Sequence, residues 1–96
     1  MITDIIIKPD DFRKWMSCCK SIFAFDCEAS SLNWLDLEII GFSICDGQQA
    51  CYVDIKQKYK KEILTILNYY LQEAKMVIMH NAPYDMVVLK KEGIEI

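Results

Sequence analysis

Two acidic side chains one residue apart close an apolar run near the N-terminus. The stretch "FDCEASSL", residues 25 to 32, contains Asp26 and Glu28. In a strand these positions face the same side, with their side chains based roughly 7 Å apart, so both carboxylates can reach one cation. Mg²⁺ and Mn²⁺ prefer oxygen ligands, and two such ions about 3.5 to 4 Å apart activate water and stabilise the leaving oxygen of a phosphodiester. A third acid from a neighbouring element, Asp85, would suit that geometry.

The residues before the two acids separate a metal site from the alternative, a solvated strand end. Residues 21 to 29, "SIFAFDCEA", alternate as a strand, and both of its faces are apolar until the acids appear. This pattern predicts a central strand that is covered on both sides. Unpaired buried charges cost several kcal/mol, which a bound cation would offset. The spacing alone is common by chance, and the apolar run favours the metal site.

The other elements predict a mixed sheet with helices beside it. Residues 4–8, 38–45, 49–55 and 75–80 are expected to be strands, and helices are expected from Pro9, over 59–74 and over 81–93. Asp46 and Gly47 indicate a hairpin, and Gly41 indicates a bulge or a close backbone approach. The final "IEI" points into a further strand. This order is typical of an α/β fold of the ribonuclease-H-like type, in which ligands bind at the carboxyl ends of parallel strands.

Length and composition indicate one globular domain over residues 1–96. The chain is 53% hydrophobic and 26% charged, and no apolar stretch reaches the ~18 residues needed to span a bilayer. An acid, Asp4, stands where a signal peptide would carry basic residues, so a cytoplasmic protein is expected. Five cysteines without C-x-x-C spacing indicate buried, reduced thiols. The net charge of −3 argues against a basic nucleic-acid surface, but not against contact through bound metal ions.

Two stretches resemble motifs of a known family. "FAFDCEASSL" resembles the first motif of the DEDD 3′-5′ exonucleases, in the form found in the proofreading domain of family A, polymerase-I-type DNA polymerases. "HNAPYDMVVLKKEGIEI" is similar to the second motif, Asn-x-x-x-Asp with a Tyr before the Asp. The hairpin between them also matches the family, so the resemblance covers about residues 4 to 96.

The resemblance implies a role for each matching residue. Asp26 would bridge two divalent ions, Mg²⁺ or Mn²⁺, Glu28 would hold the ion that activates water, and Asp85 would support the second ion. Four residues would contact the 3′ end of a single DNA strand: Leu32 as an apolar wedge, Asn81, His80 and Tyr84. The alternative for His80 is a partly buried residue at a strand end.

Two departures from the family qualify the implied function. Ala29 replaces the usual Thr, and a third motif, Tyr or His followed four residues later by the fourth carboxylate, has no counterpart in the 96 residues. The implied fold is therefore truncated before the last strand and the third-motif helix. The resemblance implies hydrolysis of 3′-terminal phosphodiesters of DNA by an incomplete domain that a separately encoded C-terminal half or a polymerase would accompany. The alternative is an inactive phage or prophage remnant, or a subunit that binds nucleic acid or a partner, with self-association through an open sheet edge.

Overall fold

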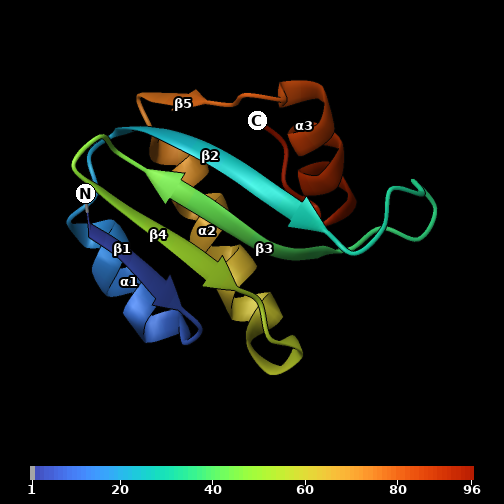
Figure 1. Ribbon diagram of the computed structural model, residues 1–96, viewed down its shortest axis with the longest axis horizontal. Coiled ribbons are helices and arrows are strands. Elements are labelled where there is room, and N and C mark those ends of the chain that lie inside the picture. The colour runs from blue at the N-terminus through green and yellow to red at the C-terminus, as the bar shows by residue number, and fades with distance from the viewer. Residues whose placement is uncertain (1) are drawn as a thin grey trace.

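The computed structural model describes residues 2–96, which form one five-stranded sheet and three α-helices (Figure 1). The sheet order is β1-β4-β3-β2-β5. The elements, in chain order, are β1 (Ile2–Ile6), α1 (Pro9–Ser17), β2 (Ile22–Ala29), β3 (Ile39–Cys45), β4 (Gln49–Asp54), a 3₁₀ turn (Gln57–Tyr59), α2 (Lys60–Glu73), β5 (Met76–Ile78) and α3 (Ala82–Lys91).

The sheet is mixed, as the order of elements predicts. β2, β3 and β4 form an antiparallel meander, while β1 runs parallel to β4 and β5 runs parallel to β2. β5 pairs with β2 only over residues 22 to 24, so the second half of β2 has no strand on that side. This leaves the carboxyl end of β2 open to groups from α3, which begins at Ala82 after the three residues 79–81 that follow β5.

The hydrophobic core lies on one face of the sheet. α1 and α2 lie behind the strands in the view of Figure 1, and Phe12, Phe25 and Phe42 are fully or almost fully buried between the layers. Phe12 and Phe25 each pack a ring against Phe42, with centroids 5.4 and 5.7 Å apart. These aromatic contacts join α1 to the two central strands.

The prediction that β2 is covered on both faces is wrong. Phe23, Phe25 and Cys27 are buried under the helices, whereas Ile22, Ala24, Asp26 and Glu28 are exposed on the other face. Ile22 and Ala24 are apolar, so the sequence pattern does not distinguish this open face from a second core-facing one. The two acids therefore stand on an open sheet face rather than at the end of a fully buried strand.

The predicted turn and helix-end residues, Asp46 and Gly93, lie at a turn and a helix end in the structure. Asp46 accepts hydrogen bonds from the backbone N–H groups of Gln48, Gln49 and Lys20 at 2.9, 3.0 and 3.1 Å, which fixes the β3–β4 turn and ties it to the chain before β2. At the end of α3, Gly93 adopts a φ of 84° and Ile94 N–H bonds to Leu89 O at 2.9 Å. The further strand expected after Gly93 is not formed in residues 94–96.

None of the five cysteines is in a disulfide, but the expectation that they are all buried is wrong. Cys27 and Cys51 are buried, Cys19 and Cys45 are half-buried, and Cys18 is exposed. Burial raises the pKa of Cys51 to about 12, so this thiol stays protonated at neutral pH. Among residues 2–96, no helix has both the length and the apolar character needed to cross a membrane.

Candidate functional site

Asp26 and Glu28 lie side by side on the open face near the end of β2. Both are exposed, and in the pairing of β2 with β3 Asp26 lies opposite Ser43 and Glu28 opposite Gly41. The β2–β3 register shifts directly after Glu28, between Glu28 and Ala29, where a bulge re-aims the chain into the following loop. Neither acid forms an ion pair with any residue of the described range. The two carboxylates are therefore available to an external cation.

Asp85 lies at the open edge of β2, in the first turn of α3. Its side chain is 0% exposed, and its Oδ1 accepts hydrogen bonds from the backbone N–H of Cys27 at 3.4 Å and from the Cys27 thiol at 3.2 Å. Its Oδ2 is buried and has no partner within residues 2–96. Burial raises the pKa of Asp85, the two hydrogen bonds from Cys27 oppose this shift, and the Asp26 charge adds to it. The carboxylate is thus held by one oxygen while the other lacks a partner.

Tyr52 is a site residue that the sequence analysis missed. It comes from β4, and its ring lies over Gly41 on the open face: a Cβ on Gly41 would be 2.6 Å from Tyr52 Cζ and closer still to the phenol oxygen. Burial raises the pKa of Tyr52, and the charges of Glu28 and Asp54 raise it further. The phenol therefore lies beside Glu28. Gly41 was the available signal, because a glycine inside a strand indicates a close approach.

The four predicted substrate contacts surround the end of β2. Leu32 is 92% exposed in the loop after β2. Asn81 and His80 are exposed before α3, and the charge of His80 lowers the pKa of Asp85, so this histidine lies near the acid. Tyr84 is half-buried; burial raises its pKa, and a hydrogen bond from the Ala29 backbone opposes that rise. That bond links α3 to the end of β2.

The structure brings the three acids near one another without gathering them into a closed ligand set. Asp26 and Glu28 face the open side, Asp85 is buried at the strand edge, and the charge of Asp26 raises the pKa of Asp85. Within the described residues, no three His, Cys, Asp or Glu side chains are grouped to hold a metal ion. The donor chemistry fits a hard divalent cation, and the unpartnered Oδ2 of Asp85 is an atom that such a cation would satisfy.

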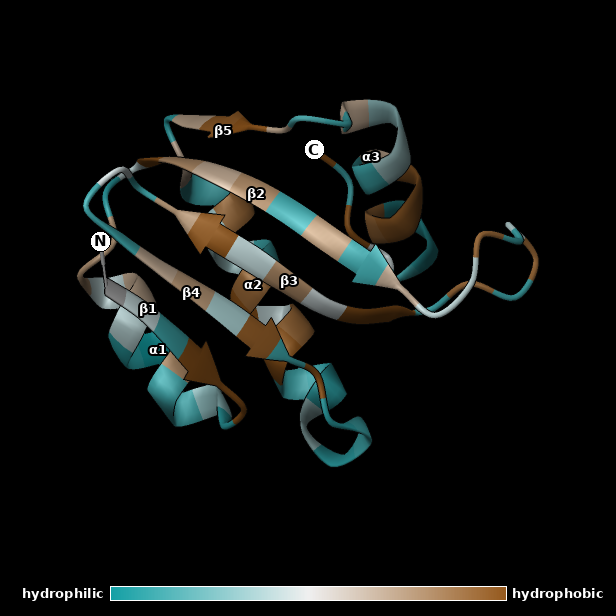
Figure 2. Ribbon diagram, in the orientation of Figure 1, coloured by the Kyte–Doolittle hydropathy of each residue, from teal (hydrophilic) through white to brown (hydrophobic). Residues whose placement is uncertain are grey.

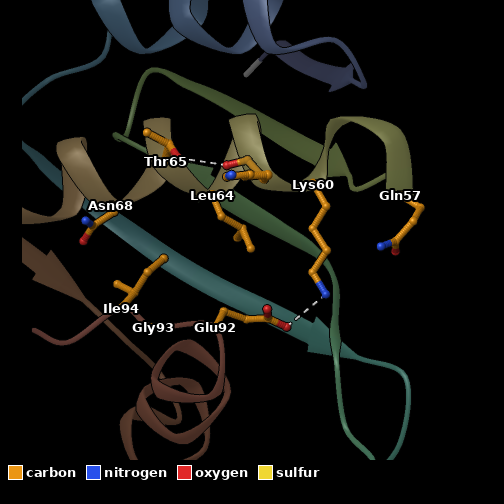
Figure 3. A pocket seen from close by; sticks show the side chains of 9 residues that line it. Gln57, Lys60, Leu64, Thr65, Asn68, Glu92, Gly93 and Ile94 are labelled. Atoms are coloured by element: carbon orange, nitrogen blue, oxygen red, sulfur yellow. Dashed lines mark hydrogen bonds and ion pairs between the residues drawn. The ribbon is translucent and has the colours of Figure 1, made fainter.

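A cavity of about 530 Å³ lies away from these acids, between α2 and the end of α3 (Figure 3). The Lys60 ammonium crosses it to Glu92 at 3.2 Å, and Glu92 also accepts a hydrogen bond from Ile39 N–H at 3.2 Å. Both side chains of the ion pair are largely buried. This network joins α2, α3 and the start of β3, so its clear role is to hold the elements that frame the site.

A family model described as "3′-5′ exonuclease" matches residues 4–96. The chain belongs to this family. Both segments that resemble the family's motifs, residues 23–32 and 80–96, lie within the matched range. A comparison with curated proteins found no match.

Solved structures agree with this membership at the level of the fold. The catalytic core of RRP6 from Trypanosoma brucei superimposes with a TM-score of 0.76 at 15% identity, over 96% of this chain and 26% of that one. Escherichia coli RNase D, an exoribonuclease involved in structured RNA processing, gives 0.75 at 15% identity, over 95% and 24%. Brucella melitensis NrnC with bound Mg²⁺ gives 0.59 at 22% identity, over 92% and 42%. The ribonuclease-H-like exonuclease fold is confirmed, and the chain spans less than half the length of each of these proteins.

Proposed function

We propose that this chain carries the first three carboxylates of a nuclease site that removes nucleotides from the 3′ end of single-stranded DNA with two divalent metal ions. The observation that supports this most is the placement of Asp26, Glu28 and Asp85 around the end of β2, in a chain of the 3′-5′ exonuclease family. Mg²⁺ or Mn²⁺ would supply the activated water and offset the charge that develops on the leaving oxygen.

Each acid has a distinct place in this proposal. Asp26 would be the ligand shared by both ions, because it is on the same strand face as Glu28 and its charge acts on Asp85. Glu28 would hold one ion on the open face, beside the Tyr52 phenol. Asp85 would offer its unpartnered Oδ2 to the second ion. Leu32, Asn81, His80 and Tyr84 would contact the substrate strand from either side.

A polypeptide of residues 1–96 would bind metal weakly and cleave DNA poorly by itself. Its three acids are not grouped in the described residues, and the Tyr-x-x-x-Asp or His-x-x-x-Asp motif of the family does not occur in its sequence. The same observations favour a second candidate, an inactive module that binds nucleic acid or a partner chain. The two candidates differ in what happens when a segment that carries the third motif is supplied.

The test combines metal binding with cleavage. Calorimetric titration with Mn²⁺ should show weak binding that Asp26→Ala abolishes, and equal signals in both proteins would contradict the metal site. A 3′-labelled DNA strand and its RNA counterpart should remain nearly intact with residues 1–96 alone. They should be degraded when a neighbouring reading frame that encodes Tyr-x-x-x-Asp or His-x-x-x-Asp is co-expressed, and Asp26→Ala should stop this. Efficient Mn²⁺-dependent cleavage by the 96 residues alone would overturn the expectation of an incomplete site.

A further inference from the structure

The loop between β2 and β3 keeps its shape through polar bonds. At its base, Ser30 N–H donates to Glu38 O at 2.9 Å, and Glu38 N–H donates to Ser30 Oγ at 3.2 Å. Within it, Asn33 O accepts from the N–H groups of Asp36 and Leu37, each at 3.0 Å, and Asn33 Oδ1 accepts from Leu35 N–H at 3.0 Å. The backbone conformation therefore does not depend on burying the apolar side chains near the tip.

Those apolar side chains point to solvent. Leu32, Trp34 and Leu35 are 92%, 55% and 76% exposed, whereas Leu37 at the base is buried. Figure 2 shows the loop protruding from the sheet with hydrophobic segments in its outer part. Three large apolar side chains exposed within four consecutive positions indicate an interaction site.

Lys91 on α3 fixes the tryptophan within this loop. Its Nζ lies 5.3 Å from the centroid of the Trp34 ring and donates hydrogen bonds to Trp34 O at 2.9 Å and Leu35 O at 3.3 Å. Both acceptors are uncharged, and Lys91 forms no ion pair in the described part of the chain. Two of the three ammonium donors are therefore used, and one further donor remains.

The acids near this lysine are engaged elsewhere. Asp36 Oδ2 accepts from Asn33 Nδ2 at 3.2 Å, and the carboxylates of Glu38 and Glu92 lie 3.8 and 3.2 Å from Lys60 Nζ. The exposed indole thus has a cation against its ring and no acid bonded to that cation.

We propose that Trp34, held in place by Lys91, stacks against a base of a single-stranded nucleic acid. An aromatic ring offers its face to any base, and an adjacent cation suits the phosphate that follows the base. The loop follows β2, which ends at Ala29 one residue after Glu28, so the chain leads from the candidate acids to this ring, and a strand whose end lies at the acids would extend toward it. This inference rests on the proposed function, because it takes the ligand to be the substrate strand of that site.

The experiment uses Trp34 as its own reporter, with EDTA present so that no cleavage occurs. The other tryptophan, Trp15, is only 8% exposed, and Trp15→Phe leaves Trp34 as the sole indole. Titration with oligodeoxythymidine should quench the Trp34 fluorescence saturably. In the otherwise native chain, Trp34→Ala should weaken binding about 5- to 100-fold, the range that one stacked base contributes, and Trp34→Phe should restore most of it.

The matched control is Tyr69→Ala, which removes a 60% exposed aromatic side chain on α2 and should leave binding unchanged. If the oligonucleotide binds the native chain and Trp34→Ala equally, the stacking inference is overturned and the proposed function stands. If it binds neither, the stacking inference is overturned, and the proposed function is tested separately by the Mn²⁺ titration and the cleavage assay. Two results together would assign the loop to a contact between copies of the chain and overturn the inference. The fluorescence would change with protein concentration in the absence of oligonucleotide, and the chain would form a dimer that Trp34→Ala dissociates.

Discussion

The Cys27 thiol donates a hydrogen bond to Asp85 Oδ1 at 3.2 Å, and the two side chains form a pair that is almost completely buried. The backbone N–H of the same cysteine donates to the same oxygen at 3.4 Å. One residue of β2 therefore determines the orientation of an acid that comes from α3. Cys27 sits between Asp26 and Glu28 in sequence but faces the helices, so a single strand supplies the exposed acids and the anchor of the buried one.

Removing this thiol should destabilise the protein in a pH-dependent way. At pH 7, Cys27→Ala should lower the free energy of unfolding by about 1–3 kcal/mol, because an ionised buried carboxylate loses a donor. The cost should shrink in acid, where Asp85 is protonated and the remaining loss is the missing packing. Urea unfolding at pH 7 and pH 4 measures both. Cys27→Ser is the control, because it keeps a hydrogen-bond donor at this position. If Cys27→Ala lowers the free energy of unfolding equally at both pH values, the prediction is contradicted.

Asp85 itself should weaken the fold at neutral pH. Its folded-state pKa is raised by burial, so its contribution to stability is greatest below the ordinary carboxyl pKa and is lost as the pH rises through the raised value. Asp85→Asn should therefore increase the free energy of unfolding at pH 7 by about 1–3 kcal/mol without metal. In thermal unfolding experiments, added Mn²⁺ should then raise the stability of the native chain and leave the stability of Asp85→Asn unchanged. A variant that is less stable than the native chain in EDTA at pH 7 would count against this account.

Gly41 should tolerate no side chain while Tyr52 occupies its present place. A Cβ there would lie 2.6 Å from Tyr52 Cζ and 3.0 Å from Val53 O, so Gly41→Ala should cost about 1–3 kcal/mol and displace the phenol from Glu28. Urea unfolding of Gly41→Ala, Tyr52→Ala and the double variant forms a double-mutant cycle. The double variant should lose less than the two single costs added together. Additive costs would show that the ring does not occupy this position.

The β3–β4 turn should respond to pH in the opposite direction from Asp85. Burial alone would raise the pKa of Asp46, but hydrogen bonds from the backbone N–H groups of Gln48, Gln49 and Lys20 outweigh it and lower the pKa. Its contribution to stability is therefore present above the ordinary carboxyl pKa and is lost as the pH falls. Asp46→Ala should cost about 1–2 kcal/mol at pH 7 and less near pH 3.

The control for the turn is Asp54→Asn. Asp54 lies 3.0 Å from Lys56 in an exposed ion pair, which contributes little. Its loss should change the unfolding midpoint much less than the loss of Asp46 does. Similar effects of the two substitutions at pH 7 would mean that the three backbone bonds to Asp46 do not hold the turn.

Much of the fold follows from local sequence signals. Pro9 begins α1, Asp46 and Gly47 form the hairpin turn, and Gly93 ends α3, because each of these residues favours a backbone geometry that its position requires. The alternation in β2 also gives the correct strand and places Asp26 and Glu28 on one face. These features depend on residues close together in the chain.

The parts that the sequence misses depend on the register between distant segments. Tyr52 meets Gly41 because β4 pairs with β3 in one particular alignment, and Cys27 meets Asp85 because β5 ends early beside β2. Gly41 indicates a close approach but not which residue makes it, and the contact of Cys27 with Asp85 has no signal in spacing or composition. The number of covered faces is missed for a different reason: Ile22 and Ala24 are apolar and yet exposed, so burial does not follow from side-chain type.

The meander of β2, β3 and β4 implies an order of events during folding. Its strands are neighbours in the chain and close short loops, whereas β5 and α3 join β2 only after the long connection through α2. Short loops form at lower entropic cost and faster than long ones. Asp26 and Glu28 are therefore expected to reach their positions early. Asp85 should arrive late, so that slow steps in refolding control when the third acid meets the other two.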